Sequence, residues 1–147
     1  MQLSTKGRYA VMAMTDLAGR PTDRATPVAE IAARQQISHA YLEQLFARLK
    51  RRGLVIGRRG PGGGYRLARP AAETSVADVV LAVDEPLRAI RCNGGHVGCM
   101  RDGVRCLTHD LWEETGRQIR NYLASVSLAD VASGKLRRPA ATTEAAA

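Results

Sequence analysis

Three cysteines and one histidine, Cys92, Cys99, Cys106 and His109, lie close together in the sequence and could jointly bind a metal. Six residues separate the first cysteine from the second, and six separate the second from the third. Structural zinc sites favour close cysteine pairs, about two to four residues apart. Longer, even gaps between soft thiolate ligands suit an iron–sulfur cluster better. We therefore predict an iron–sulfur centre, with three free thiols and a surface histidine as the alternative.

The residue types leave two histidines open as the fourth ligand. His109 stands at the first position of a predicted helix, after Thr108 as N-cap, and a ligand at a helix start is held firmly. His96 lies between the first two cysteines and is its rival. The third histidine, His39, is far away in the sequence and is expected to contact a nucleic acid rather than a metal.

The N-terminal sequence and the cysteine count bear on the compartment. Residues 1–10 lack the apolar segment of a signal peptide, and an odd number of cysteines in such a chain does not indicate a disulfide framework. No apolar run approaches the roughly 18 residues that span a bilayer. The sequence therefore predicts a cytoplasmic protein with no membrane partner.

Positive charge is concentrated in the N-terminal half. Residues 1–70 carry 13 basic and four acidic side chains, whereas residues 71–147 carry nine basic and ten acidic ones. Between Arg48 and Arg69 there are eight basic residues and no acidic residue. This asymmetry indicates a surface that meets a polyanion, although a solvated basic face is the simpler alternative.

The elements of that half follow the order of a winged helix-turn-helix. Helical spacing of apolar residues and capping signals predict helices from Ser4 or Thr5 to about Gly19, after Thr26, and from Ser38 to Gly53. Short apolar segments at 54–56 and 65–67 flank a glycine-rich basic stretch and predict a hairpin. Three helices followed by a hairpin are typical of a winged DNA-binding domain. A nucleotide-binding loop is disfavoured, because no Lys-Ser/Thr pair and no helix follow the glycines.

The third helix and the hairpin supply candidate DNA contacts. The N-terminal polar residues of a recognition helix reach base edges, while arginines and glycines of a wing approach phosphates closely. Phe46 is expected in the core. The candidate contacts are Ser38, His39, Tyr41, Glu43, Gln44, Arg58, Arg59, Gly60, Pro61 and Gly62.

The C-terminal half contains three more predicted helices. A capping box at Ser75 and Asp78 starts a fourth helix, which Glu85–Pro86 stops, and Ser127 with Asp130 starts a sixth. The fifth, after Thr108, has an apolar seam wider than a small domain needs, which suggests burial against a second copy of the chain. From about Gly134 the composition predicts disorder. The residues expected at a dimer interface are Leu111, Thr115, Ile119, Tyr122 and Leu123.

Several of these segments together are similar to a known family. The matching runs lie at 4–11, 38–46, 59–65, 83–85, 91–92 and 106–112. The chain resembles the IscR-type iron–sulfur cluster regulators from residue 1 to about 131, and these are dimeric winged-helix transcription factors. The family pattern has five residues in each gap between cysteines, whereas this chain has six.

The resemblance implies residue roles. Three cysteines and a histidine of the family hold a [2Fe–2S] cluster, and they match Cys92, Cys99, Cys106 and His109. The family's recognition helix matches 38–52, with Glu43 at the position that discriminates between two classes of DNA site. Its wing matches 59–64.

The sequence thus predicts a mainly α-helical homodimer with a small β-hairpin wing and a long dimerisation helix. Residues 1–70 would bind double-stranded DNA, 71–133 would hold the [2Fe–2S] cluster and dimerise, and 134–147 would be a tail. We expect a regulator that represses cluster-assembly genes and receives its cluster from the assembly machinery, as the resemblance implies. A regulator that responds to redox stress, nitric oxide or iron through the same ligands is the first alternative, and a small electron carrier the second. No arrangement typical of a hydrolase or transferase stands out, so no enzymatic activity is expected.

Overall fold

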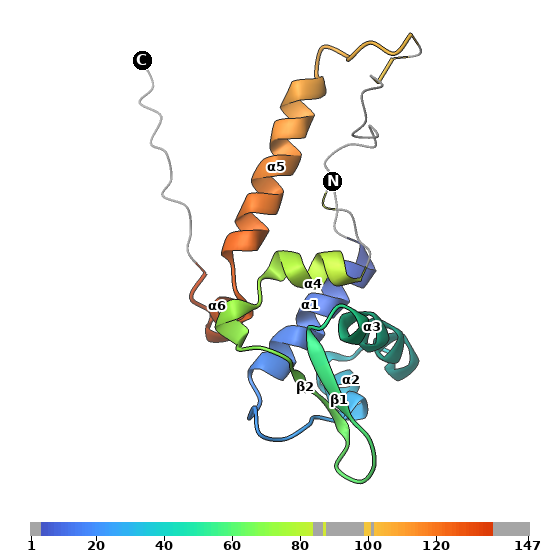
Figure 1. The fold of residues 1–147 in the computed structure, drawn as a ribbon, viewed down its shortest axis with the longest axis vertical. Helices are drawn as coiled ribbons and strands as arrows, with labels where there is room; N and C mark the ends of the chain where they lie inside the picture. Colours follow the sequence, from blue (N-terminus) through green and yellow to red (C-terminus); the bar gives the residue numbers. More distant parts are fainter. Residues whose placement is uncertain (1–3, 84–86, 88–98, 101, 137–147) are drawn as a thin grey trace.

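The computed structural model describes residues 4–83, 87, 99–100 and 102–136, and within them it is mainly helical (Figure 1). The single sheet among these residues is a two-stranded antiparallel hairpin. The predicted fold class is therefore confirmed. The elements are α1 (Thr5–Ala18), α2 (Val28–Gln35), α3 (His39–Arg51), β1 (Val55–Arg58), β2 (Gly64–Leu67), the 3₁₀ turn η1 (Ala71–Glu73), α4 (Val76–Ala82), α5 (His109–Ser125) and α6 (Leu128–Ser133).

Most helices begin at the predicted caps. The Ser4 hydroxyl accepts the Gly7 N–H at the start of α1, and the Ser38 hydroxyl accepts the Tyr41 N–H at the start of α3. Full capping boxes begin α4 at Ser75 and α6 at Ser127. These short-range hydrogen bonds satisfy N–H groups that have no partner within a helix.

The predicted start of the second helix is wrong. Pro27, not Thr26, is the N-cap residue of α2, and its ring offers no side-chain cap. Thr26 is buried and pairs with Tyr65, each N–H donating to the other's carbonyl at 2.8 and 2.9 Å. The backbones approach so closely that a Cβ on Gly64 would collide with the Thr26 carbonyl. Thr26 therefore adds a third extended segment to the hairpin, a long-range pairing that no local signal revealed.

Both strands extend further toward the tip of the hairpin than predicted. In the ladder, Val55 is opposite Leu67 and Arg58 is opposite Gly64. The additional residues bring Gly57 opposite Tyr65, so the aromatic ring lies over the base of the wing. The basic and glycine-rich residues form the exposed tip that follows.

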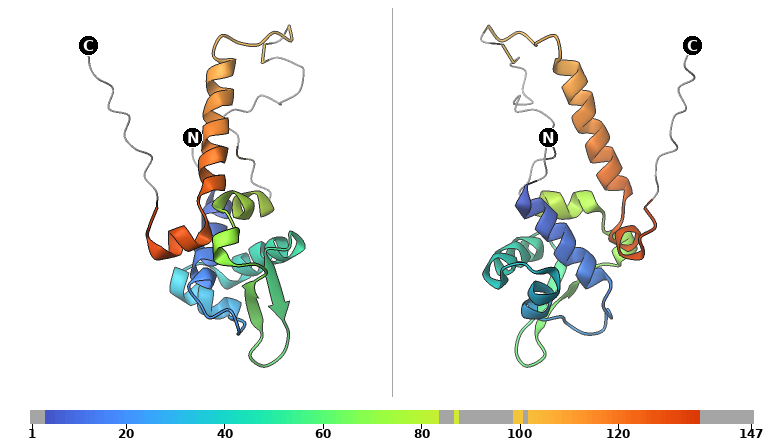
Figure 2. Two further views of the ribbon diagram at one scale, coloured as in Figure 1. Left: turned by 60° about the vertical axis from the view of Figure 1, so that its left-hand side comes forward. Right: turned by 180° about the vertical axis from the view of Figure 1, so that it is seen from behind.

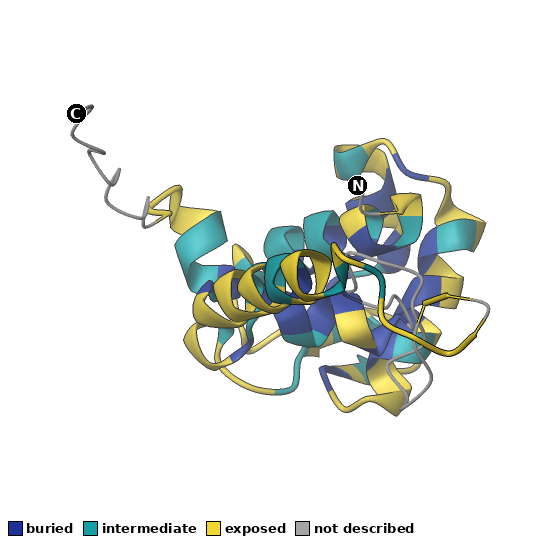
Figure 3. Cartoon of the chain, turned by 90° about the horizontal axis from the view of Figure 1, so that it is seen from above, coloured by how far each residue is buried: buried dark blue, intermediate teal, exposed yellow. Residues whose placement is uncertain are grey.

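One continuous core holds α1 to α4 and α6 together. Phe46 is fully buried, as predicted, and stacks on Tyr65 with ring centroids 4.7 Å apart. Val83 and Leu128 belong to the same core as Phe46, so packing is continuous across residue 70. A smaller cluster joins Leu87 to residues of α4 and to Val126. Figure 3 shows the buried residues gathered in the body of the molecule.

Helix α5 projects from that body (Figures 1 and 2). Gly116 is the only buried residue in its 17-residue length. Among the described residues, no helix combines the length and apolarity needed to cross a membrane. The predicted stop at Glu85–Pro86 lies outside the described residues, as do residues 137–147 of the predicted tail; α4 itself ends at Ala82.

Candidate nucleic-acid interface and metal centre

Helix α3 separates an apolar face from a polar one. Its buried residues are Leu42, Leu45, Phe46 and Leu49, spaced at three and four residues. His39, Glu43 and Gln44 are exposed at its N-terminal end. Tyr41 is half-buried and meets the Tyr9 ring edge to face, so it is partly a packing residue. Ser38 acts as the N-cap.

A groove of about 460 Å³ lies between α3, the start of α2 and the hairpin. It brings together four of the predicted contacts: His39, Glu43, Arg58 and Arg59. Ser38, Tyr41, Gln44 and the 60–62 tip do not line it. Among the lining residues that sequence reasoning missed, Lys50 and Tyr65 have the largest polar side chains. Lys50 lies seven residues after Glu43, two helical turns along the same face, and that spacing was the available signal.

The groove has the charge expected of a phosphate-binding surface. Lys50, Arg58 and Arg59 contribute three cations, and Glu43 is the acidic residue among the described lining residues. His39 Nε2 lies 3.6 Å from Glu43 Oε1, one helical turn away. A polyanion in this groove would thus meet the cationic side chains of the hairpin. On α3 it would meet the Glu43 carboxylate, which lies beside His39.

An ion pair between the buried Asp16 carboxylate and the partly exposed Arg34 side chain joins the first two helices. The Asp16 side chain is only 2% exposed, and its carboxylate accepts hydrogen bonds from Arg34 at 2.7 and 3.0 Å and from Gln35 at 2.7 Å. Burial raises the pKa of Asp16, but these hydrogen bonds and the Arg34 and Arg20 charges outweigh it, so the pKa is lowered. This ties α1 to the end of α2, immediately before Gln36 takes a left-handed conformation and leads into α3.

The second cluster surrounds the start of α5. Cys99 Sγ lies 2.8 Å from His109 Nδ1, although nine residues separate them in the sequence. The His109 N–H donates to the Cys106 carbonyl at 3.0 Å, and Cys106 Sγ lies 3.7 Å from Thr108 Oγ1. Thr108 is the N-cap residue as predicted, but its side chain makes no capping hydrogen bond.

A tight turn positions Cys99. Met100 and Val104 pair through a main-chain hydrogen bond of 3.0 Å, and Asp102 accepts the Val104 N–H at 3.2 Å. Gly103 takes a positive φ of 79° within that turn, which favours glycine. The turn reverses the chain so that the Cys99 thiol meets the His109 ring, whereas Cys106 contacts His109 through its main-chain carbonyl. Cys92 and His96 lie outside the described residues.

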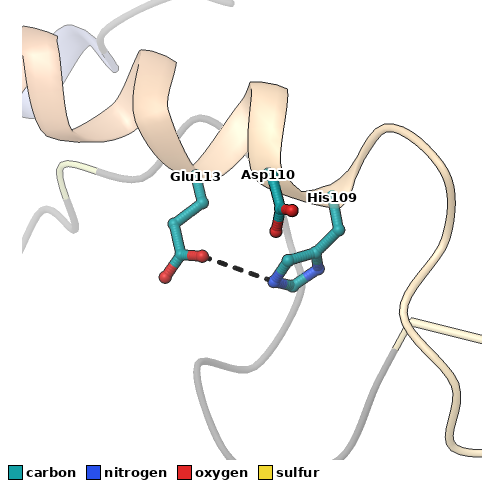
Figure 4. Close-up of side chains that lie close together, drawn as sticks. All are labelled: His109, Asp110 and Glu113. Atoms are coloured by element: carbon teal, nitrogen blue, oxygen red, sulfur yellow. Dashed lines mark ion pairs between the residues drawn. The ribbon is translucent and has the colours of Figure 1, made fainter.

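Two carboxylates also lie beside His109 (Figure 4). Ligand atoms of His109, Asp110 and Glu113 all lie within 4.8 Å of one another, and His109 Nε2 is 3.6 Å from Glu113 Oε2. Nδ1 thus faces the Cys99 thiol while Nε2 faces a carboxylate. Metal-bound histidines commonly use one nitrogen as ligand and direct the other to a carboxylate. Two partly exposed thiols and an oriented imidazole fit the donor set of an iron–sulfur cluster.

The predicted dimer residues lie on the projecting helix. Leu111 and Tyr122 are exposed, at 60% and 43%, while Thr115, Ile119 and Leu123 are half-buried. Trp112, which belongs to the same predicted apolar seam, is 42% exposed. Large apolar side chains on a helix with one buried residue form a surface that favours a protein partner.

Comparisons with known proteins agree with this geometry. The family model Rrf2, described as "Iron-dependent Transcriptional regulator", matches residues 3–134. The HTH-type transcriptional regulator IscR of Photorhabdus laumondii is 49% identical over 92% of this chain and 81% of its own length. IscR of Xenorhabdus nematophila is 50% identical over 89% and 79%, respectively.

Solved structures show the same fold. CymR, the global cysteine regulator of B. subtilis, superposes with a TM-score of 0.77 at 28% identity, covering 92% of this chain and 98% of CymR. IscR of T. potens superposes with a TM-score of 0.71 at 33% identity, covering 95% and 94% of the two chains. Both likenesses include the projecting helix as well as the helix-turn-helix, since they extend over nearly the whole chain.

Proposed function

Because the chain belongs to the Rrf2 family of transcriptional regulators, and so regulates through DNA and is not an enzyme, we propose that it senses cluster supply through a bound [2Fe–2S] cluster. The observation that carries the proposal is the approach of the Cys99 thiol to the His109 ring at the start of α5, and Cys106, three residues before His109, is a further proposed ligand. Cys92 is the proposed fourth ligand. Anaerobically purified protein should show visible absorption and two iron atoms per chain, as a [2Fe–2S] cluster requires; a colourless, iron-free protein would contradict the proposal.

The DNA-binding step follows from the groove. The exposed N-terminal side chains of α3, His39, Glu43 and Gln44, would enter the major groove, while Arg58 and Arg59 of the hairpin would contact the phosphate backbone. Glu43 would disfavour sites that place an acceptor or a phosphate against it, and so would contribute specificity. Residues 1–70 are the proposed DNA-binding part and 71–133 the proposed sensing and dimerising part.

Replacing Arg59 with alanine is expected to weaken binding to every duplex, by about tenfold at low salt. The slope of log affinity against log salt should fall by about one, because one phosphate contact is lost. Fluorescence anisotropy at several salt concentrations measures both effects. Arg69→Ala is the matched control, because Arg69 pairs with Asp78 at 3.2 Å and lies outside the groove. If Arg59→Ala bound non-specific DNA as tightly as the wild type does, the hairpin would not be part of the DNA interface.

We propose that the apolar face of α5 pairs with the same face of a second chain. Two recognition helices would then reach half-sites about one helical turn apart, in successive major grooves. The four proposed ligands would tie the 87–107 segment to α5, and thereby set the relative position of the two α3 helices. The bound cluster would be a labile group, so occupancy of the site would follow the amount of cluster that the cell makes available.

Ile119→Glu is expected to convert the dimer to monomer, raising the dimer dissociation constant by more than about a hundredfold. The substitution would bury an unpaired carboxylate, at a cost of several kcal/mol. Sedimentation equilibrium over a range of protein concentrations measures it. Asn121→Glu is the control, because Asn121 is exposed on another face of the same helix. An unaltered oligomeric state for Ile119→Glu would place the interface elsewhere.

The sign of regulation and the signal belong to the same proposal. We propose that the cluster-bound form represses cluster-assembly genes, and that the assembly machinery donates the cluster. The exposed Cys99 thiol and half-buried Cys106 favour a second candidate, a response to oxidants or nitric oxide at the same ligands. Comparing DNA affinity before and after anaerobic exposure to nitric oxide or peroxide, at fixed cluster supply, separates the two.

A further inference from the structure

Two arginines from different helices hold the main chain where it leaves α4. Arg48 of α3 donates to the Val83 carbonyl, and Arg120 of α5 donates to the Leu87 carbonyl. We propose that Arg48 and Arg120 are positioning residues that transmit occupancy of the metal centre to the recognition helix. The proposal rests on the proposed function and names the route of its regulation.

Arg48 connects the recognition helix to the end of α4. Its Nη1 lies 3.3 Å from the carbonyl oxygen of Val83, which is the C-cap residue of α4. Carbonyls at a helix C-terminus have no partner within the helix, and a cation there is favoured by the helix dipole. Arg48 lies on the same helix as His39 and Glu43, so its hydrogen bond to Val83 joins the end of α4 to the wall of the groove.

Arg120 makes the corresponding contact from the sensing side. Its Nη1 lies 3.0 Å from the carbonyl oxygen of Leu87. Leu87 precedes Cys92 by five residues in the sequence, and Arg120 lies three helical turns after His109 on α5. Arg120 therefore holds the residue at which the chain begins its path to the proposed ligands.

The two carbonyls belong to different apolar clusters. Val83 is fully buried in the main core, beside Leu45 and Leu49 of α3. Leu87 is 5% exposed and packs in the smaller cluster with Val80 and Val126. Val80 belongs to α4, the helix whose C-cap carbonyl Arg48 holds, so a displacement of Leu87 acts on α4 and through it on Val83.

The coupling then follows from the connectivity. Ligation at Cys92 and at the start of α5 constrains the chain that begins at Leu87, and Arg120 fixes that chain relative to α5. The constraint reaches α3 through the Val83 carbonyl and Arg48. Coupling of this kind is reciprocal, so DNA binding should also slow loss of the cluster.

The test compares DNA affinity with and without the cluster. A duplex is first selected from random sequences with the cluster-bound wild type, and the ratio of its dissociation constants for the apo and cluster-bound forms is measured at one salt concentration. In Arg48→Met and Arg120→Met we expect this ratio to move toward one by about tenfold, with iron content and thermal unfolding close to wild type. Methionine keeps the apolar stem and removes the donor.

Two further variants separate coupling from a structural role. Arg48→Lys retains a cationic donor and should restore much of the wild-type ratio. Arg117→Met removes an arginine of α5 that pairs with Glu114 instead, and should leave the ratio unchanged. If wild type shows a ratio far from one and Arg48→Met retains it, or Arg48→Lys behaves like Arg48→Met, the coupling proposal is overturned. A wild-type ratio of one would overturn cluster sensing itself, and the coupling proposal with it.

Discussion

Cys99→Ala is expected to abolish cluster binding, lowering the iron content of anaerobically purified protein to background. Cys99 Sγ lies 2.8 Å from His109 Nδ1, and an alanine methyl cannot bind iron. Visible absorption and iron analysis measure the loss. Met100→Ala is the matched control, because Met100 is the exposed neighbour on the same turn and its thioether is not a proposed ligand. A Cys99→Ala protein that retained its cluster would exclude Cys99 as a ligand.

The same measurements identify the histidine ligand. We expect His109→Ala to lose the cluster spectrum and His96→Ala to keep it. Glu113→Gln should weaken iron retention by about 10–100-fold, because the carboxylate 3.6 Å from Nε2 orients the ring without being a ligand itself. The opposite pattern for the two histidines would place the ligand at residue 96. Complete loss in Glu113→Gln would make the carboxylate a ligand instead.

Asp16→Asn is expected to lower the free energy of unfolding by about 2–3 kcal/mol. The Asp16 carboxylate is 2% exposed and accepts hydrogen bonds from Arg34 and Gln35, so the amide would leave a guanidinium without its counter-charge. Breaking a fully buried pair costs about 3–5 kcal/mol, and we expect less here because the Arg34 side chain is 30% exposed. Urea unfolding measures the change, and Asp23→Asn in the exposed loop after α1 is the control.

The lowered pKa of Asp16 gives this contribution a defined pH dependence. The unfolded chain binds the proton more readily than the folded one, so the stability from Asp16 is present above the unfolded pKa. It is lost as pH falls below that value toward the folded pKa. Wild-type and Asp16→Asn stabilities should therefore converge in acid. A difference between them that stays constant from neutral pH into that acidic range would contradict the role of the charge.

Local sequence determined where four of the helices begin. Ser4, Ser38, Ser75 and Ser127 each cap a helix through a hydrogen bond to a residue three positions ahead, which the sequence alone makes recognisable. Apolar spacing within α3 likewise identified its buried face and therefore its exposed one. The hairpin was foreseen for the same reason, because its turn residues are consecutive. The four proposed ligands follow from the family resemblance.

Tertiary structure decided how those elements meet. Thr26 has the residue type of a cap, but its backbone pairs with Tyr65, 39 residues away. The Asp16–Arg34 pair, the approach of Cys99 to His109 and the Arg48–Val83 hydrogen bond all join residues on different elements. No periodicity or capping signal encodes such pairs, because each depends on the relative placement of two elements. That placement is set by burial of Phe46, Met14 and Val83 in one shared core. The free energy gained by burying apolar surface is roughly proportional to the buried area and does not depend on how far apart the residues lie in the sequence.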